Sequence, residues 1–410
     1  MRTSGRSIGV VAGGLVLIGA AVASAQDWPQ WRGANRDGKA TGFTAPAKWP
    51  AALAQKWSVK VGTGCATPAL VGDKLYVFAR QGDEEVTLCL SAADGKEIWK
   101  DKVAAQAVTG PANRHPGPRS SPAVADGKVV TLGVGGVLSC LDAADGKVLW
   151  RKDEFPKVVP KFFTSTSPLI VDGMAVAHLG GPGNGALVAL DLATGAPKWR
   201  WAVEGPDYGS PVVMTADGTK QIVTPTEKSI VGVGAADGKL LWQVPFVPQG
   251  RAYNSATPVV DGATVYVTGS GRGTRALKIA KQGDGFAATP LWSNAEVASQ
   301  FSSPVLKDGR LFGLSDRGTL FCLDAQTGQA AWTDGVQRDR GSFTALVDAG
   351  PVLLALPSSS ELVVFKPDAK EYAEVARIKV SETPTYATPV VAGNRVFVKD
   401  QESVTLLTLE

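Results

Sequence analysis

Cysteine and histidine are scarce in this chain, and their scarcity excludes several classes of protein. The 410 residues include four cysteines and two histidines. No Cys-x-x-Cys pair occurs, so neither a zinc knuckle nor a covalently attached haem is indicated. His115 and His178 are too few for a multi-histidine metal site. The first cysteine is Cys65, so none lies just after the N-terminal segment to accept a lipid anchor.

An excess of charge of one sign is also missing. Removing the first 25 residues, which hold Arg2, Arg6 and no acidic residue, leaves 40 of the 42 basic residues against 38 acidic residues. Nucleic-acid-binding proteins normally carry a clear basic excess. We therefore expect no nucleic-acid partner.

The N-terminal segment has the layout of a secretory signal. Two arginines precede an apolar run from Ile8 to Val22, which ends in Ala23-Ser24-Ala25, the small residues that signal cleavage requires. The run is shorter than the roughly 20 residues that span a bilayer. We expect residues 1–25 to be removed, leaving an exported periplasmic or extracellular chain without a transmembrane segment. An uncleaved anchor is the alternative.

Repeats fill most of the remaining chain. The second half of each repeat is a short strand, an acidic-Gly or Thr-Gly turn and a strand ending in tryptophan, and such turns between apolar runs predict hairpins. The first half is Ser/Thr-Pro, a strand, a turn and a strand, and proline suits a strand entrance. Five tryptophan-ending copies occur: LCLSAADGKEIW, SCLDAADGKVLW, VALDLATGAPKW, VGVGAADGKLLW and FCLDAQTGQAAW.

Each full repeat is therefore predicted to form four strands. Cysteine occupies one apolar slot in three copies, which favours small buried side chains over a disulfide framework. The repeats open at Thr67, Ser121, Ser167, Ser210, Thr257, Ser303, Thr344 and Thr388, and only Thr344 lacks the following proline.

The two ends of the chain complement each other. The last copy, from Thr388 to Leu409, supplies only three strands, while Leu53 to Val61, with Trp57, supplies one strand of the missing type. Joining them closes a ring and hides sheet edges. We predict an all-β, eight-bladed β-propeller of four-stranded antiparallel blades over residues 53–410, preceded by an arm over residues 26–52. A linear solenoid is the structural alternative.

The pattern Ala189-x-Asp191-x-x-Thr194-Gly195-x-x-x-Trp199 resembles the pyrroloquinoline quinone (PQQ) repeat family. In that family the blade tryptophan docks against the neighbouring blade. The resemblance implies this structural role for Trp57, Trp99, Trp150, Trp199, Trp242, Trp292 and Trp332.

The family contains both enzymes and scaffolds. Its quinoprotein alcohol dehydrogenases carry adjacent cysteines and a calcium ion held by Glu, Asn and Asp, whereas its BamB-like exported members are non-enzymatic. No Cys-Cys pair occurs here, and the dehydrogenases' catalytic residues match no positions. We therefore expect a monomeric, non-enzymatic module that binds a protein, an envelope component or a small anionic ligand, without a cofactor. The alternative is a PQQ-dependent dehydrogenase with an atypical site, which would bind PQQ with Ca2+.

The predicted strand order places the long loops on one rim, where binding residues usually concentrate. Arginines from several blades on that rim could bind a carboxylate or another anion. The alternative is that they are solvated and paired with nearby acids, and that His115 is a solvated loop residue. The candidates are Arg114, His115, Arg119, Arg251, Arg272, Arg275, Arg338 and Arg340.

The arm begins with DWPQWRGANRDG, Asp27 to Gly38, which has neither a helical nor a strand period. A similar opening occurs in exported PQQ-repeat proteins, so we place it in the mature chain. Trp28 and Trp31 are expected to pack onto the propeller rim. A role in contacting ligand is the alternative.

Overall fold

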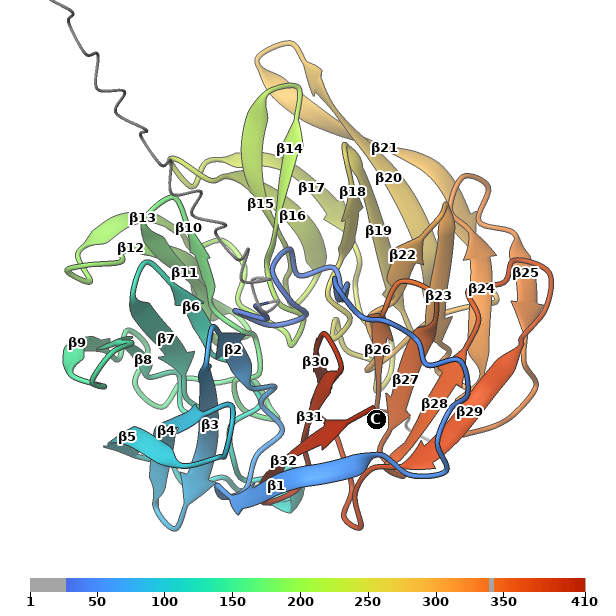
Figure 1. Cartoon of the computed structure of the whole chain (residues 1–410). Coiled ribbons are helices and arrows are strands. Elements are labelled where there is room, and N and C mark those ends of the chain that lie inside the picture. The colour runs from blue at the N-terminus through green and yellow to red at the C-terminus, as the bar shows by residue number, and fades with distance from the viewer. Residues whose placement is uncertain (1–26, 339–342, 410) are drawn as a thin grey trace, which may run out of the picture.

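The computed structural model describes residues 27–338 and 343–409. The predicted signal segment 1–25 and Arg340 lie outside the described residues. Eight four-stranded antiparallel sheets form a closed ring (Figure 1), which confirms the predicted propeller.

Blades 1 to 4 each use four consecutive strands. Within a blade the strands pair in chain order, and the first strand lies nearest the centre of the ring (Figure 1). The strands are β2 (Ala69–Val71), β3 (Lys74–Gln81), β4 (Glu84–Ser91) and β5 (Glu97–Ala104) in blade 1; β6 (Ala123–Ala125), β7 (Lys128–Leu132), β8 (Leu138–Asp142) and β9 (Val148–Lys152) in blade 2; β10 (Leu169–Val171), β11 (Met174–Gly181), β12 (Asn184–Asp191) and β13 (Pro197–Trp201) in blade 3; and β14 (Val212–Ala216), β15 (Thr219–Pro225), β16 (Ser229–Gly234) and β17 (Leu240–Pro245) in blade 4.

Blades 5 to 7 repeat this order, and blade 8 combines the two ends of the chain. The strands are β18 (Val259–Asp261), β19 (Thr264–Gly269), β20 (Gly273–Gln282) and β21 (Gly285–Asn294) in blade 5; β22 (Val305–Lys307), β23 (Arg310–Leu314), β24 (Leu320–Asp324) and β25 (Ala330–Thr333) in blade 6; β26 (Thr344–Asp348), β27 (Leu353–Pro357), β28 (Glu361–Phe365) and β29 (Glu374–Lys379) in blade 7; and β30 (Val390–Ala392), β31 (Arg395–Lys399), β32 (Ser403–Thr408) and β1 (Ala54–Lys60) in blade 8.

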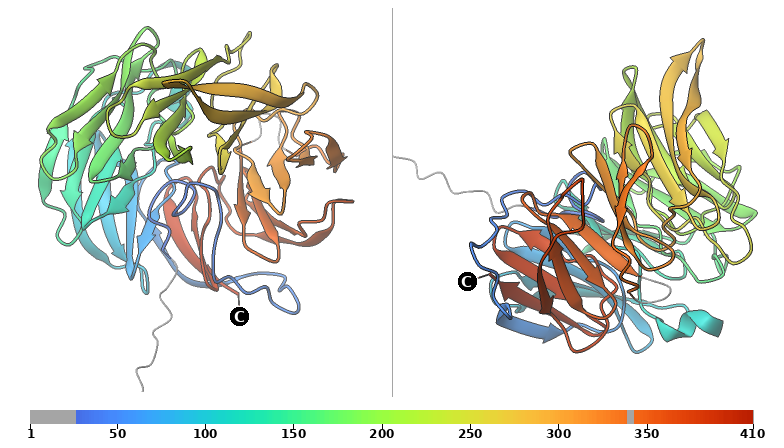
Figure 2. Two further views of the ribbon diagram at one scale, coloured as in Figure 1. Left: turned by 90° about the horizontal axis from the view of Figure 1, so that it is seen from above. Right: turned by 90° about the vertical axis from the view of Figure 1, so that its right-hand side faces the viewer.

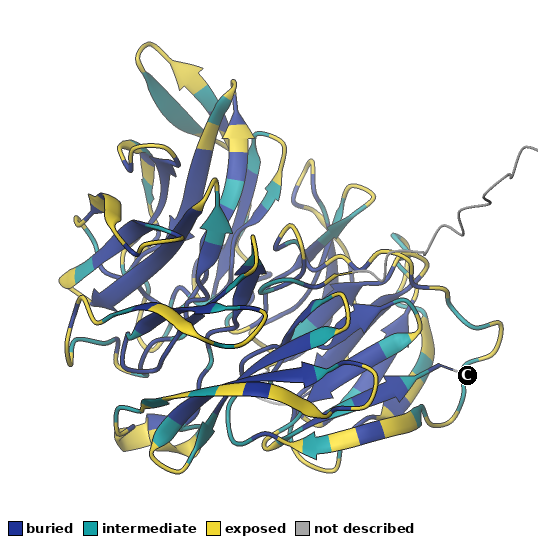
Figure 3. Cartoon of the chain, turned by 60° about the vertical axis from the view of Figure 1, so that its left-hand side comes forward, coloured by how far each residue is buried: buried dark blue, intermediate teal, exposed yellow. Residues whose placement is uncertain are grey.

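The ring closes where the N-terminal strand joins the C-terminal ones. β1 pairs antiparallel with β32, and Trp57 lies opposite Leu406. A closed ring leaves no blade without a neighbour on either face, so its apolar faces are covered. Figure 3 shows buried residues through the blade interiors and exposed residues on turns and outer strands.

The blade tryptophans lie against the turn of the next blade. A Cβ on Gly238 would lie 2.5 Å from the Cε3 atom of Trp199, so only glycine leaves room for the ring. The Trp199 indole also donates to the Ala235 carbonyl at 2.9 Å. Equivalent indole bonds to the next blade are made by Trp57, Trp99, Trp150, Trp292 and Trp332.

Trp242 differs because blade 5 lacks the usual turn between its third and fourth strands. β20 and β21 instead extend into a long hairpin that projects from the ring (Figure 2). The Trp242 indole donates to Gln221 Oε1 in its own blade at 2.7 Å.

A belt of hydrogen bonds joins the blades at the Ser/Thr residues that open them. In each link, the backbone N–H of the opening residue donates to the hydroxyl of the opening residue of the next blade. The series breaks at blade 7, where Thr344 N–H donates to Ser302 Oγ at 3.2 Å. The links run from Thr388 to Thr67, Thr67 to Ser121, Ser121 to Ser167, Ser167 to Ser210, Ser210 to Thr257 and Thr257 to Ser303, at 2.9–3.2 Å.

Removing one hydroxyl from this belt should destabilise the protein. Ser210→Ala leaves the buried N–H of Ser167 without its acceptor, which costs about 1 to 3 kcal/mol. Urea unfolding followed by tryptophan fluorescence measures the loss. Ser359→Ala, at an exposed serine, is the matched control and should be neutral. Equal stability of the two variants would show that the belt contributes nothing.

Residues 28–40 of the N-terminal arm lie in the centre of the ring rather than on its rim, and the rest of the arm runs outward to β1 (Figure 1). Trp28 is fully buried and forms a two-way backbone bridge with Leu70 in blade 1. Hydrogen bonds tie the arm to seven blades, through Leu70, Val124, Pro168, Pro211, Thr257, Ser303 and Asp348.

Two buried arginines fix the arm at the level of the belt. Arg36 donates to the carbonyls of Ser167, Pro168 and Pro211, and Arg32 donates to those of Ser303 and Pro304. These carbonyls lie at the blade entrances, where strand pairing has not yet begun. Burial lowers the pKa of Arg36 to about 9, so the cation persists at neutral pH.

Candidate functional site

The ring has two rims that carry different connections between strands. The turn rim carries the turns after the first and third strands of each blade, and the loop rim carries the remaining turns and the connections between blades. The N-terminal arm occupies the centre up to the belt. Beyond it, on the loop-rim side, lies a cavity of about 420 Å3, and Trp31 forms part of its floor, donating to Thr257 Oγ1 at 3.1 Å.

One repeat position supplies much of the cavity wall. Seven lining residues stand two positions before the Ser/Thr that opens a blade, and the belt holds this position at the same height in each. The residue type at this position differs between blades, so side chains of different chemistry line the cavity at equivalent places in the ring. The seven are Cys65, Arg119, Ser165, Tyr208, Ser255, Phe301 and Tyr386.

Aromatic side chains dominate the surface of the cavity. Phe162, Tyr208 and Tyr253 contact one another with ring centroids 5.3–6.2 Å apart, and Tyr253 meets the other two rings edge-on. Phe343 lies between Phe301 and Tyr386 on another part of the wall. Such a surface suits apolar or planar groups.

The long loop after blade 1 brings three of the predicted ligand-face residues together. It contains the 3-10 helix η1 (Gly110–Arg114), and Arg114, His115 and Arg119 all line the cavity. Arg119 Nη2 donates to the His115 carbonyl at 2.7 Å, while its Nη1 has no hydrogen-bond partner among the described residues. This nitrogen is buried, so a ligand that reached it in the cavity would pair a donor that the described residues leave unpaired.

Among the described residues, the charged side chains that line the cavity are those of Arg114 and Arg119. No Asp or Glu side chain is among its lining residues in the described part of the chain. Burial, followed by the charges of Arg119 and Arg114, lowers the pKa of His115, so its ring is neutral at pH 7. The ring packs edge-on against Tyr386 at 4.7 Å. The two arginines therefore provide the cavity's charge at neutral pH.

Arg251 and Arg272 fall outside the aromatic cavity. Arg251 lines a neighbouring hollow. Arg272 is buried and donates to the carbonyls of Phe246 and Tyr253, both at 3.0 Å. Its guanidinium thus holds the Tyr253 loop in place and is not free for a ligand.

Arg275 and Arg338 are also engaged within the protein. Arg275 lies 5.4 Å from the Phe246 ring. Arg338 is buried, pairs with Asp334 and donates to the Tyr372 hydroxyl at 3.3 Å. Arg340 lies outside the described residues.

The second histidine is a structural residue. His178, on β11, is fully buried, and its Nε2 donates to the Glu204 carbonyl at 3.1 Å. Burial lowers its pKa from 6.5 to about 4. The folded protein therefore resists protonation at a site that the unfolded chain protonates readily.

Acid should destabilise the protein through this residue. Because the unfolded state binds the proton more tightly, the free energy of unfolding falls as the pH drops from 6.5 towards 4, by about 2 to 3 kcal/mol. Urea unfolding at pH 7 and pH 4.5 measures this loss. His178→Gln keeps a donor for Glu204 but cannot titrate, so it should lose less stability in acid than the wild type. An identical acid-induced loss would contradict this assignment.

No three-residue group of His, Cys, Asp or Glu suited to a metal ion occurs within residues 27–338 and 343–409. In the same ranges, no helix is long and apolar enough to cross a membrane.

The fold places the chain among closed, eight-bladed PQQ-like repeat propellers. A family model described as outer membrane protein assembly factor BamB matches residues 36–210 and 82–334. Because these ranges cover more than half of the chain, the chain belongs to that family.

Curated relatives carry the same description. The outer membrane protein assembly factor BamB of Burkholderia pseudomallei is 24% identical over 362 residues, covering 85% of this chain and 86% of the relative. The BamB of Yersinia pestis is 25% identical over 323 residues, covering 76% of this chain and 67% of that relative.

Solved structures of two kinds share the fold. BamB from Moraxella catarrhalis aligns with a TM-score of 0.67 at 15% identity, covering 87% of this chain and all of that one. Quinohemoprotein alcohol dehydrogenase from Comamonas testosteroni aligns with a TM-score of 0.68 at 17% identity, covering 95% of this chain and 81% of the dehydrogenase chain. At these identities the likeness establishes the fold alone.

Proposed function

We propose that this chain is an exported, non-enzymatic scaffold in outer membrane protein assembly, and that it binds a polypeptide partner through its loop rim. Membership of the family and the description of its relatives support the process. The observation that carries the choice of face is the cavity of about 420 Å3 on the loop rim. The arm occupies the centre of the ring on the other side.

The composition of the cavity favours binding over redox catalysis. Calcium requires several oxygen ligands, chiefly carboxylates and amide carbonyls. Among the described residues, the cavity lining includes no Asp, Glu or Asn side chain. These residues do not fit a calcium-dependent quinone site, and the proposal includes no cofactor.

Cells of the source organism provide the test. Strains without this chain should contain less outer membrane protein, and the wild-type gene should restore it. A chain altered in the cavity, by Phe162→Ala with Tyr208→Ala, should restore less, while Lys96→Ala on the exposed turn rim should restore it fully. Unchanged outer membrane protein levels in the deletion strain would refute the proposed process.

A melting experiment separates this proposal from the dehydrogenase alternative. The purified chain should melt at the same temperature with and without saturating PQQ and Ca2+, since a ligand that binds only the folded state raises the melting temperature. A rise in melting temperature, accompanied by dye-linked alcohol oxidation, would favour the enzyme.

A further inference from the structure

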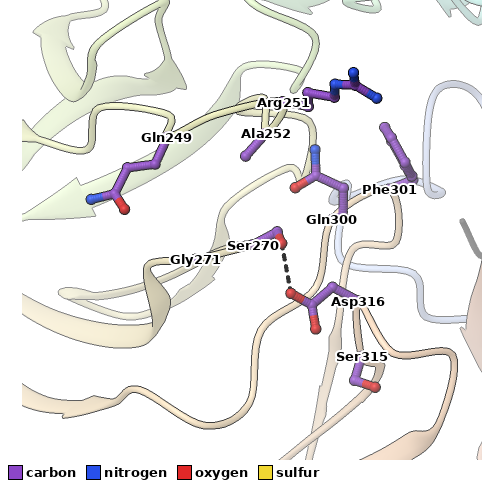
Figure 4. A pocket seen from close by; sticks show the side chains of 9 residues that line it. All are labelled: Gln249, Arg251, Ala252, Ser270, Gly271, Gln300, Phe301, Ser315 and Asp316. Atoms are coloured by element: carbon purple, nitrogen blue, oxygen red, sulfur yellow. Dashed lines mark hydrogen bonds between the residues drawn. The ribbon is translucent and has the colours of Figure 1, made fainter.

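Two hollows on the loop rim meet at one residue. The aromatic cavity includes Phe301 in its wall, and Phe301 also lines a second hollow of about 310 Å3. Figure 4 shows this second hollow, with Gln300 beside Phe301 and with Ser270 facing Asp316. The two hollows therefore offer adjoining surfaces of different polarity.

The second hollow is more polar than the aromatic cavity, and its lining includes a side-chain amide without hydrogen-bond partners. Neither Oε1 nor Nε2 of Gln300 has a hydrogen-bond partner among the described residues. A buried donor and acceptor left unpaired cost free energy, which a ligand with the complementary pair recovers. A peptide group carries one donor and one acceptor side by side. Asp316 is already engaged, because Ser270 Oγ donates to it at 2.6 Å.

The aromatic cavity also contains polar atoms without hydrogen-bond partners, but of a different kind. Arg119 Nη1 and the Ser255 hydroxyl lack partners among the described residues. Arg114 adds a second cation, and no carboxylate among the described lining residues balances them. A group suited to this cavity therefore combines an apolar or aromatic body with a negative charge.

We propose that the two hollows together bind one extended polypeptide segment. Its aromatic side chain and a carboxylate occupy the aromatic cavity, where Arg119 binds the carboxylate, and a neighbouring peptide group pairs with the Gln300 amide. The carboxylate is supplied by the end of a chain or by an acidic side chain beside the aromatic residue. This inference rests on the proposed function, because it specifies the partner's chemistry at the loop rim.

Fluorescence anisotropy with labelled peptides tests the site on the purified chain, without the predicted signal segment 1–25. The probes are Gly-Ser-Gly-Ser-Phe with a free carboxylate, the same peptide as its amide, and amidated Gly-Ser-Asp-Phe-Gly and Gly-Ser-Asn-Phe-Gly. At least one carboxylate peptide should bind about tenfold more tightly than its neutral counterpart. Which of the two binds more tightly identifies the source of the carboxylate.

Variants assign the contacts. Arg119→Gln should remove the preference for the carboxylate, and Gln300→Leu should weaken every peptide about threefold to tenfold. Arg317→Gln, an exposed loop-rim arginine outside both hollows, removes the same charge and should change nothing. Melting temperatures show whether each variant is folded. If Arg119→Gln does not fold, Arg119→Lys replaces it and should retain part of the preference for the carboxylate.

Two results would overturn the inference. One is the absence of binding by all four peptides at millimolar concentration. The other is binding of 3-phenylpropionate as tightly as any peptide, with no effect of Gln300→Leu, which would indicate a site for a free aromatic acid. If peptides fail to bind while the wild-type gene still restores outer membrane protein levels, this inference fails and the proposed function stands.

Discussion

Replacing Trp28 with alanine is expected to lower the free energy of unfolding by about 3 to 5 kcal/mol, the usual cost of removing a large buried aromatic side chain. Trp28 is fully buried and belongs to a core shared by blades 1, 7 and 8. Its ring also packs on Gly33, where a Cβ would lie 3.5 Å from the indole. The substitution therefore removes one of the contacts that anchor the arm in the centre.

Urea unfolding of the purified chain measures this loss. Trp49→Ala is the matched control, since Trp49 lies in the same arm but is only partly buried, and its loss should be clearly smaller. If the two variants unfolded at the same urea concentration as the wild type, the arm would have no part in holding the ring together.

Replacing Trp199 with alanine should have an effect of similar size, about 3 to 5 kcal/mol. Trp199 is buried between blades 3 and 4, in a cluster with Ile222 and Val231. Its indole bond to Ala235 is lost as well. The same urea titration measures the effect.

A pair of glycine substitutions isolates the docking contact from backbone strain. Gly238 and Gly218 have similar positive φ angles, 68° and 75°, so alanine strains both by about 1 kcal/mol. At Gly238 the new Cβ would also displace Trp199, whereas at Gly218 no atom lies within 4 Å. Gly238→Ala should therefore be the more destabilising. Equal losses would contradict docking by Trp199.

The architecture was predictable because the same strand and turn motifs recur many times along the sequence. Asp-Gly turns and Ser/Thr-Pro entrances mark each blade, and the single strand around Trp57 matches the strand missing after Thr388. Each signal is local, and the closed ring follows from counting them.

The location of the arm was not predictable in this way. Its sequence from Asp27 to Gly38 has no period, and Arg32 and Arg36 adopt positive φ angles of 60° and 58°, which sequence patterns rarely indicate. Arginines in a loop suggest a solvated surface, yet these two bind the carbonyls at the blade entrances. Only the assembled ring creates those acceptors.

The candidate site was predicted in part. Sequence spacing placed the arginines on one rim, but it could not show which of them the protein itself uses. Arg272 and Arg338 make internal bonds, while Arg119 keeps a free donor. The aromatic wall could have been found by aligning the repeats and comparing the residue two positions before each opening Ser/Thr, as Tyr208 and Tyr386 illustrate.

The most direct test of the proposed function is site-specific photo-crosslinking in cells. A photoreactive residue replaces exposed Arg114 on the loop rim or, as the control, exposed Lys96 on the turn rim. We predict that the probe at position 114 captures outer membrane proteins or components of their assembly machinery, and that the probe at position 96 captures few or none. Capture at position 96 alone, or no capture at either, would contradict a scaffold that binds its partner through the loop rim.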